Sequence, residues 1–213
     1  NLFQILCGLF LVVSYSSCMH SEEDKVDVLI IGGGASGVTS GIQSARMGAN
    51  TLILEESTWL GGMLTSAGVS AVDGNYRLPA GLWGEFKKRL SDYYGGLDSL
   101  KTGWVSNVLF EPSVGNKILH EMVAAENNLK VWKQACLEEV KRTGDEWVAK
   151  VKVEGQGVKT VRAKVMIDAT ELGDVAKICG VKYDIGMESR DDTHEDIAPE
   201  KKNNIVQDIT YVA

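Results

Sequence analysis

Glycines at a regular spacing follow a short apolar run near the N-terminal end, in the stretch IIGGGASGVTSG. In the pattern Gly32-x-Gly34-x-x-Gly37, the first glycine permits a sharp turn from a strand into a helix. The second lets the backbone approach a pyrophosphate, and the third allows the helix to pack closely on the strand. The spacing predicts a pyrophosphate-binding turn, although a lone match would indicate only a glycine-rich loop. Gly33 has no role in this pattern and is the least informative of the three consecutive glycines.

An acidic residue stands where the second strand of a nucleotide-binding unit would end. Glu55 follows the predicted strand at residues 51–54 and lies about 20 residues beyond the glycines. Its carboxylate would accept hydrogen bonds from ribose hydroxyls and repel a 2′-phosphate, which disfavours a phosphorylated nicotinamide dinucleotide. The neighbouring Glu56 is the alternative, but strand alternation and spacing favour Glu55. Together with the glycines, Glu55 predicts a dinucleotide site.

The elements that position these residues are predicted to form a βαβ unit. Residues 26–31 make a nearly continuous apolar run, which is typical of a strand buried on both faces of a parallel sheet. Residues 35–47 have the periodicity of a helix that stops at Gly48, and residues 51–54 form a second strand. Such a unit closes right-handed into a parallel sheet.

Two amphipathic helices are predicted after an irregular, glycine-rich stretch at residues 61–75. The first spans residues 79–94, with Pro79 as its first helical residue. The second begins at Pro112 and ends near residue 126. We therefore expect residues 79–127 to form a helical excursion from the sheet.

A β-meander is predicted over residues 130–164, because this region has strand patterning separated by glycine-containing turns. Its strands are expected at residues 130–134, 136–141, 146–153 and 158–164. After them we expect a buried strand at residues 165–168, a short helix at 174–179 and a polar, solvated loop at 189–204.

Several other side chains could take part in chemistry, but structural roles are favoured for them. Asp168, Glu171 and Asp174 cluster where the last parallel strand would end, and we expect Asp174 to cap the short helix while the others turn the chain. His120 is expected on the flank or surface of its helix. The tryptophans are expected to pack in the core or in loops, namely Trp59, Trp83 and Trp104. No residue is assigned as a catalytic acid or base.

The charge and the cysteines exclude two kinds of site. The net charge is −7, and the 22 Lys and Arg residues are scattered along the chain, which argues against nucleic-acid binding. Cys7, Cys18, Cys136 and Cys179 stand far apart, without a CxxC pair. They indicate neither a metal site nor a disulfide framework.

Residues 1–18 resemble the end of a signal peptide, because an apolar run of about twelve residues gives way to small polar ones. The run is too short to cross a bilayer. Cys18 resembles the lipidated residue of a bacterial lipobox, although Tyr15 departs from the usual Leu, and an acidic run follows within the predicted linker at 19–25. We expect the chain to begin inside a signal sequence. The protein would be exported as a periplasmic or cell-surface lipoprotein attached to the membrane through Cys18, or otherwise secreted.

The sequence around Glu55 resembles that of the FAD-dependent oxidoreductases, in which a Gly-Gly pair follows the acidic residue. The pair is matched here by Gly61-Gly62. The stretches LGGMLTSAGV and VMIDATELGDVAKICGV resemble one bacterial subgroup, which includes secreted proteins of carbohydrate-degrading bacteria. The resemblance covers about residues 25–188 and implies FAD as the cofactor.

The resemblance also implies which residues bind FAD. These are Gly32, Gly34 and Gly37 at the pyrophosphate with Ala35 and Ser36 between them, Glu55 at the ribose, Gly61, Gly62 and Met63 on the flavin side, Leu137 at the adenine through its backbone, and Ala169 and Thr170 flanking the dinucleotide. A core position for Leu137 and ordinary apolar cover for Met63 are the alternatives.

The expected fold is a three-layer α/β, Rossmann-like FAD/NAD(P)-binding domain over residues 26–188 with the β-meander inserted. Residues 189–213 would begin a C-terminal part that completes the substrate pocket and lies beyond this chain, so that the chain alone would be inactive. The expected function is an oxidoreductase whose flavin accepts hydride from a small-molecule substrate, with a carbohydrate-related compound as one option. A carbohydrate-active lyase with a non-redox flavin, and a fragment that only binds nucleotide, are the alternatives.

Overall fold

The computed structural model describes residues 23–208. The predicted signal peptide with Cys18, and the predicted linker as far as residue 22, lie outside the described residues. Between residues 23 and 208, no helix is long and apolar enough to cross a membrane. The predictions for the N-terminal region therefore stay predictions.

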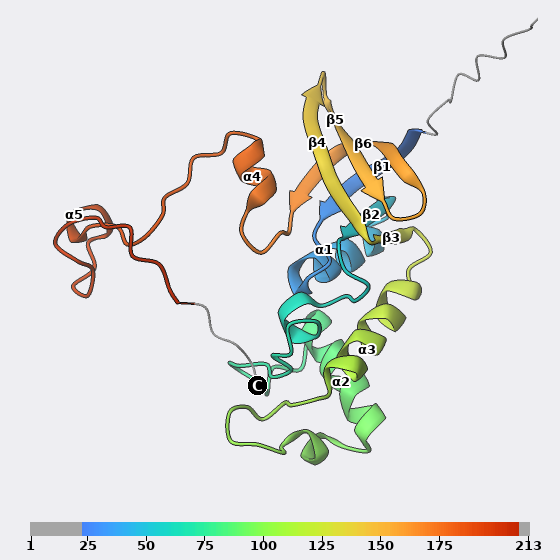
Figure 1. Cartoon of the computed structure of the whole chain (residues 1–213). Helices are drawn as coiled ribbons and strands as arrows, with labels where there is room; N and C mark the ends of the chain where they lie inside the picture. The colour runs from blue at the N-terminus through green and yellow to red at the C-terminus, as the bar shows by residue number, and fades with distance from the viewer. Residues whose placement is uncertain (1–22, 209–213) are drawn as a thin grey trace, which may run out of the picture.

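A six-stranded mixed sheet with the strand order β3-β2-β1-β6-β5-β4 forms the centre of the protein (Figure 1). β1 (Glu23–Ile31) pairs in parallel with β2 (Thr51–Glu55) on one side and with β6 (Gly157–Asp168) on the other. β2 also pairs in parallel with β3 (Leu129–Lys133). These four strands make the parallel part of the sheet.

The antiparallel part is smaller than the predicted meander. β4 (Ala135–Thr143) pairs with β5 (Glu146–Val153), and β5 pairs with the first half of β6. The prediction that the meander starts at residue 130 was wrong, because β3 pairs in parallel with β2. The strands predicted at 158–164 and 165–168 are one continuous strand, since β6 bonds to β5 and to β1 along its two edges.

The central strand β1 is buried on both faces. The side chain of Ile30 belongs to one hydrophobic core, whereas those of Leu29 and Ile31 belong to another on the opposite face. Their exposed fractions are 0%, 0% and 6%, respectively. Burial on both faces explains why the run is continuous rather than alternating, as strands in the middle of parallel sheets usually are.

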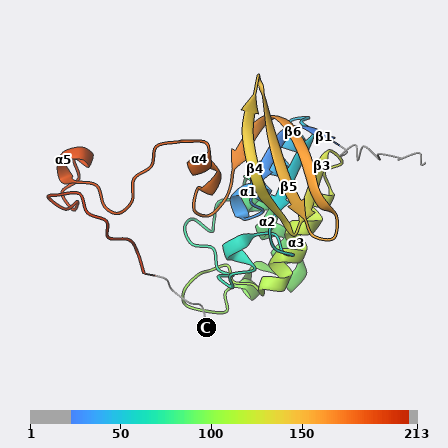
Figure 2. The same cartoon turned by 45° about the horizontal axis from the view of Figure 1, so that its top comes forward.

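Helices cover one face of the sheet, and the antiparallel strands fold over the other (Figures 1 and 2). The first core joins β1 and β2 to α1 (Ala35–Arg46), α2 (Gly81–Tyr94) and α3 (Pro112–Ala124). The second core joins the same two strands to β4, β5 and β6. The structure thus confirms the predicted three-layer α/β architecture.

The helix α2 begins at Gly81 and not at Pro79, so the predicted start was wrong. The segment before the helix is held in another conformation by the buried Lys87, whose Nζ donates to the carbonyl oxygens of Leu78 (2.9 Å) and Tyr76. In a helix that started at Pro79, the carbonyl oxygen of Leu78 would point along the helix and accept an amide of its first turn instead. The short helix η2 (Leu97–Leu100) follows α2, and α3 begins at Pro112 as predicted.

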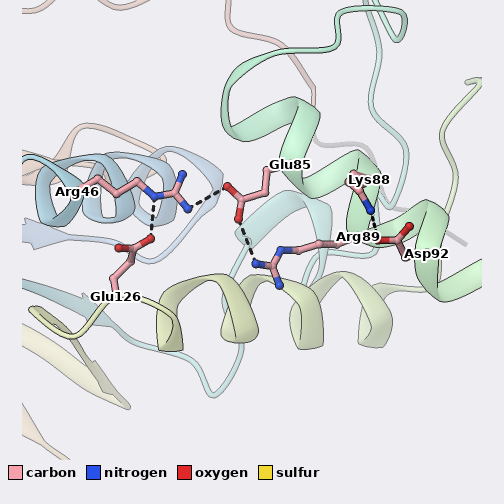
Figure 3. A network of polar contacts seen from close by, with 6 residues as sticks. All are labelled: Arg46, Glu85, Lys88, Arg89, Asp92 and Glu126. Atoms are coloured by element: carbon pink, nitrogen blue, oxygen red, sulfur yellow. Dashed lines mark hydrogen bonds and ion pairs between the residues drawn. The ribbon is translucent and has the colours of Figure 1, made fainter.

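The three helices are joined by Arg46, at the end of α1 (Figure 3). Its Nη2 lies 2.9 Å from Oε2 of Glu85 in α2, and its Nε lies 2.7 Å from Oε1 of Glu126, just after α3. The hydrogen bonds with Glu126 and Glu85 raise the pKa of Arg46 above its ordinary value. Arg89 contacts the second oxygen of Glu85 at 3.2 Å. One side chain therefore links elements that are distant in sequence.

The chain beyond β6 is less compact. After α4 (Asp174–Ile178) it runs away from the sheet through mostly exposed residues (Figure 1). The polar region at 189–204 was predicted as a plain loop, but it contains the short helix α5 (Arg190–Thr193), capped by the side chain of Ser189. A β-bridge between Met187 and Asn203 closes this segment.

We predict that replacing Arg46 with Met lowers the free energy of unfolding by about 1 kcal/mol, because two partly buried ion pairs between helices are lost. The matched control is Lys88→Met, which removes an exposed pair within α2, Lys88 to Asp92 at 2.6 Å. This control should cost less than about 0.5 kcal/mol. Chemical denaturation of both variants measures the difference, and equal effects would contradict the linking role of Arg46.

Candidate functional site

A pocket of about 280 Å³ lies at the carboxyl ends of β1 and β6. From β1 the chain crosses through α1 to β2 on one side, whereas β6 returns on the other side of β1. Ligands of parallel sheets bind in the crevice where the strand order reverses in this way. The pocket is therefore where the topology alone would place a ligand.

Predicted cofactor-binding residues from distant parts of the sequence line this pocket, namely Gly32, Gly34, Glu55, Gly62, Leu137, Ala169 and Thr170. The remaining ones do not line it. Ala35 and Ser36 are exposed at the first turn of α1, Gly37 and Gly61 are buried, and Met63 is 62% exposed. A contact between these five residues and a cofactor stays a prediction.

The three glycines of the pattern have three different surroundings. Gly32 has φ of 102°, and a Cβ on it would lie 2.4 Å from the carbonyl oxygen of Ala169. A Cβ on Gly37 would lie 1.9 Å from the carbonyl oxygen of Gly32. Gly34, at the N-cap of α1, has no atom within 4 Å of its Cβ position. Gly32 and Gly37 are thus required by the turn and its packing, whereas Gly34 leaves open space at the helix N-terminus.

Gly33, which is uninformative in the glycine pattern, is closely constrained in the structure. Its N–H donates to Oε2 of Glu55 at 2.8 Å, and a Cβ on it would lie 2.7 Å from the same oxygen and 3.0 Å from Cδ2 of Leu60. The other carboxylate oxygen of Glu55 accepts from the N–H of Ser57 at 2.7 Å. Glu55 therefore fixes the glycine loop from the end of β2, a role that the sequence pattern does not reveal.

The Gly61-Gly62 turn packs directly onto the glycine loop. The N–H of Gly61 donates to the carbonyl oxygen of Gly33 at 2.8 Å, and Gly61 needs its glycine because φ is 107°. The short helix η1 (Gly62–Leu64) starts there. From the helical layer, Oδ1 of Asn116 accepts from the N–H of Leu60 at 2.9 Å. The turn is held on both sides.

The loop after β6 is organised by Asp168. Its Oδ1 accepts from the N–H (3.0 Å) and hydroxyl (2.6 Å) of Thr170, and its Oδ2 accepts from the N–H of Ala176 (2.7 Å). Burial raises the pKa of Asp168, but these hydrogen bonds outweigh it and leave the pKa below its ordinary value. The predicted capping role of Asp174 was wrong, since the N-cap is Gly173 in the left-handed conformation.

The far wall of the pocket comes from the start of β4. Ala135 and Leu137 line it there, and the pairing of β4 with β5 shifts register between Leu137 and Glu139. Leu137 also packs against the second core. The position of Leu137 is therefore compatible both with a core role and with a backbone contact to adenine, the two interpretations that the sequence left open.

The remaining candidates lie elsewhere. His120 is half-buried on α3 and does not line the pocket, and burial followed by the charge of Lys133 lowers its pKa. Trp59 is half-buried, and Trp83 packs at the edge of the first core. Trp104 is 95% exposed, so the expectation that it packs was wrong.

Some lining residues were not assigned to the site from the sequence. Most of them lie in a loop after a strand or at the start of the next element, namely Glu56, Ser57, Ala135, Glu171, Leu172 and Asp174, whereas Ser66 follows the short helix η1. The order of the strands in the sheet could have identified some of these residues. Since β6 neighbours β1, the loop after β6 must lie beside the glycine loop, which brings Glu171 and Asp174 into the pocket.

The sequence matches a protein-family model, described as FAD dependent oxidoreductase, over residues 27–212. No curated protein matches the sequence significantly. The family match covers both glycine motifs and the whole sheet apart from the first residues of β1.

Solved structures of similar fold include a flavoprotein/dehydrogenase from Cytophaga hutchinsonii, with 18% identity and a TM-score of 0.55 over 74% of this chain and 42% of that chain. A geranylgeranyl bacteriochlorophyll reductase-like protein from Thermoplasma acidophilum has 18% identity and a TM-score of 0.53, over 75% of this chain and 43% of that one. Anhydrotetracycline hydroxylase from Streptomyces rimosus has 16% identity and a TM-score of 0.54, over 76% and 36%. At these identities the likeness shows the fold alone. The chain spans less than half the length of each of these structures.

We predict that Gly33→Ala lowers the free energy of unfolding by about 1–3 kcal/mol, because the added methyl group overlaps Glu55 and Leu60. Gly34→Ala is the matched control. It has open space and φ of −65°, which alanine adopts readily, so its effect should stay within about 0.5 kcal/mol. Urea denaturation of the two variants tests this difference, and a neutral Gly33→Ala would mean that the Glu55 clamp does not hold the loop.

Proposed function

The chain belongs to the family of FAD-dependent oxidoreductases, and from this premise we propose that the whole protein oxidises a small-molecule substrate with FAD as the two-electron acceptor. FAD is the cofactor of the family. The observation that carries the proposal for this chain is the open space at Gly34, which lies at the N-terminus of α1 and at the reversal of the strand order. An anionic pyrophosphate is the ligand that such a place favours.

The residues around this space fit the adenosine diphosphate half of FAD. Gly34 lets backbone approach the pyrophosphate, and the unpaired N–H groups of the first turn of α1 donate to it. Each carboxylate oxygen of Glu55 accepts one hydrogen bond within the protein, from the N–H of Gly33 and from the N–H of Ser57, respectively. A carboxylate has about four acceptor positions, so Glu55 can still accept from the ribose hydroxyls.

The apolar wall of the pocket fits the adenine. Ala135 and Leu137 present aliphatic surface there, and the backbone of Leu137 lies beside a register shift, where regular pairing with β5 is interrupted. A backbone group freed from regular pairing can bond to an adenine edge. Gly62 also lines the pocket, and by the family resemblance it would contact the flavin half.

For the substrate we propose a carbohydrate-related compound. The support is the likeness of the stretches around Gly61-Gly62 and Asp168 to those of secreted proteins from carbohydrate-degrading bacteria. No side chain within residues 23–208 is proposed as the acid or base. The oxidised group of the substrate would meet the flavin beyond Gly62 and Met63.

Replacing Gly34 with Val should abolish FAD retention and leave the fold intact, because the added side chain projects into the space where the pyrophosphate is proposed to lie. The absorption bands of oxidised flavin in the purified protein measure retention, and circular dichroism measures the fold. Unchanged flavin content in this variant would show that the cofactor does not enter at the glycine loop.

The oxidoreductase activity has its own test. When the full-length protein with bound FAD is mixed anaerobically with a panel of sugars and amino sugars, we expect one class to bleach the visible flavin absorption, because hydride transfer reduces the flavin. Re-oxidation in air should restore the spectrum. Product formation from a sugar with a lastingly oxidised flavin would instead support a lyase.

We also propose that the protein is exported and attached to a membrane through a lipid on Cys18. The support is the sequence around this cysteine, which lies outside the described residues. Metabolic labelling with a radioactive fatty acid tests the attachment, and an unlabelled mature protein that starts beyond Cys18 would contradict it.

A further inference from the structure

The side chains that line the pocket carry negative charge. Among the described residues, those that line it include the carboxylates of Glu55, Glu56, Glu171 and Asp174 but no Lys, Arg or His. Pyrophosphate is an anion, and proteins usually meet phosphate groups with Arg or Lys as well as with a helix N-terminus. The N-terminus of α1 contributes only about half a positive charge. The electrostatic balance in the pocket is therefore negative before any ligand enters.

Glu171 reaches the part of the pocket where the glycine loop and the Gly61-Gly62 turn meet. The Cβ position of Gly62 lies 3.1 Å from Oε1 of Glu171 and 3.1 Å from Cα of Gly34. The carboxylate oxygen and Gly34 thus flank the same point. An anion that approaches Gly34 comes close to the negative charge of Glu171.

The surroundings of Glu171 differ from those of Glu55. Both oxygens of Glu55 accept backbone N–H groups, which spread its charge into the loop. Within residues 23–208 no hydrogen bond or ion pair holds the carboxylate of Glu171, and the residue is exposed. Lys177, six residues further along the chain in α4, lies over the ring of Tyr183, 5.8 Å from its centroid. The charge of Glu171 is therefore free to act on the ligand.

We propose that Glu171 weakens the binding of the pyrophosphate and reverses the usual salt dependence, so that FAD affinity rises with ionic strength. The inference rests on the proposed function, because it requires FAD in this pocket. The inference assigns a role to a residue that lies outside the glycine pattern. Glu171 would weaken FAD binding, whereas the residues of the pattern strengthen it.

The sign follows from screening. Where a ligand anion meets basic side chains, salt weakens binding because it screens an attraction. Here the two negative charges of the pyrophosphate meet carboxylates, and salt screens a repulsion. The Debye length falls from about 20 Å at 0.02 M salt to about 6 Å at 0.3 M, which is close to the separations within the pocket.

The test is the FAD dissociation constant of the full chain, measured by quenching of flavin fluorescence at about 0.02 M and 0.3 M NaCl with EDTA present. At low salt, Glu171→Gln should bind FAD about five- to tenfold more tightly than the unaltered protein, and the difference should shrink below about twofold at high salt. The matched control is Glu121→Gln, which removes the same charge from an exposed position of α3 outside the pocket. It should bind FAD as the unaltered protein does.

ADP-ribose, which carries the same pyrophosphate without the flavin, should give the same order of affinities by calorimetry. Equal affinity of the unaltered protein and Glu171→Gln at low salt would overturn the inference, as would a fall in affinity with added NaCl. If neither FAD nor ADP-ribose binds any of the three proteins, the proposed function fails as well, so the two failures are distinguishable.

Discussion

The carboxylate of Glu55 is the contact on which the site depends. It ends β2 and accepts the N–H of Gly33, which belongs to the loop after β1, and that of Ser57 in its own loop. The carbonyl of Gly33 in turn accepts the N–H of Gly61. The loop after β1 and two points of the loop after β2 are therefore joined through one side chain and one glycine. The residue that the sequence assigns to the ligand also builds the binding site.

The parallel strands explain why these loops meet at all. β1 lies between β2 and β6, so the loops after all three strands open at the same edge of the sheet. The helical layer contacts this edge through Asn116, whose Oδ1 accepts the N–H of Leu60 beside the Gly61-Gly62 turn. The strand order thus explains why a ligand binds at this edge, whereas the lining residues and the family match indicate that the ligand is FAD.

Elements that depend on a local sequence pattern were predicted correctly. The predictions were wrong where the structure depends on which strands pair with each other. The turn with Gly32, Gly34 and Gly37 and the bounds of β5 follow from local pattern. The parallel pairing of β3 could not be predicted, because an apolar strand has the same pattern whichever direction its neighbour runs. Gly33 was undervalued for a similar reason, since its constraint is a contact with Glu55, distant in sequence.

The continuity of β6 limits where this domain can change in length. One strand pairs with β1 in the parallel sheet and with β5 in the antiparallel part, and it ends at the Asp168 turn beside the pocket. An added residue within β6 would turn every later side chain of the strand to the opposite face of the sheet and would displace the Asp168 turn. The hairpin between Thr143 and Glu146 lies at the opposite end of β4 from Leu137 and is exposed. That hairpin is the place where an inserted tag or a naturally lengthened loop would leave the cofactor site undisturbed.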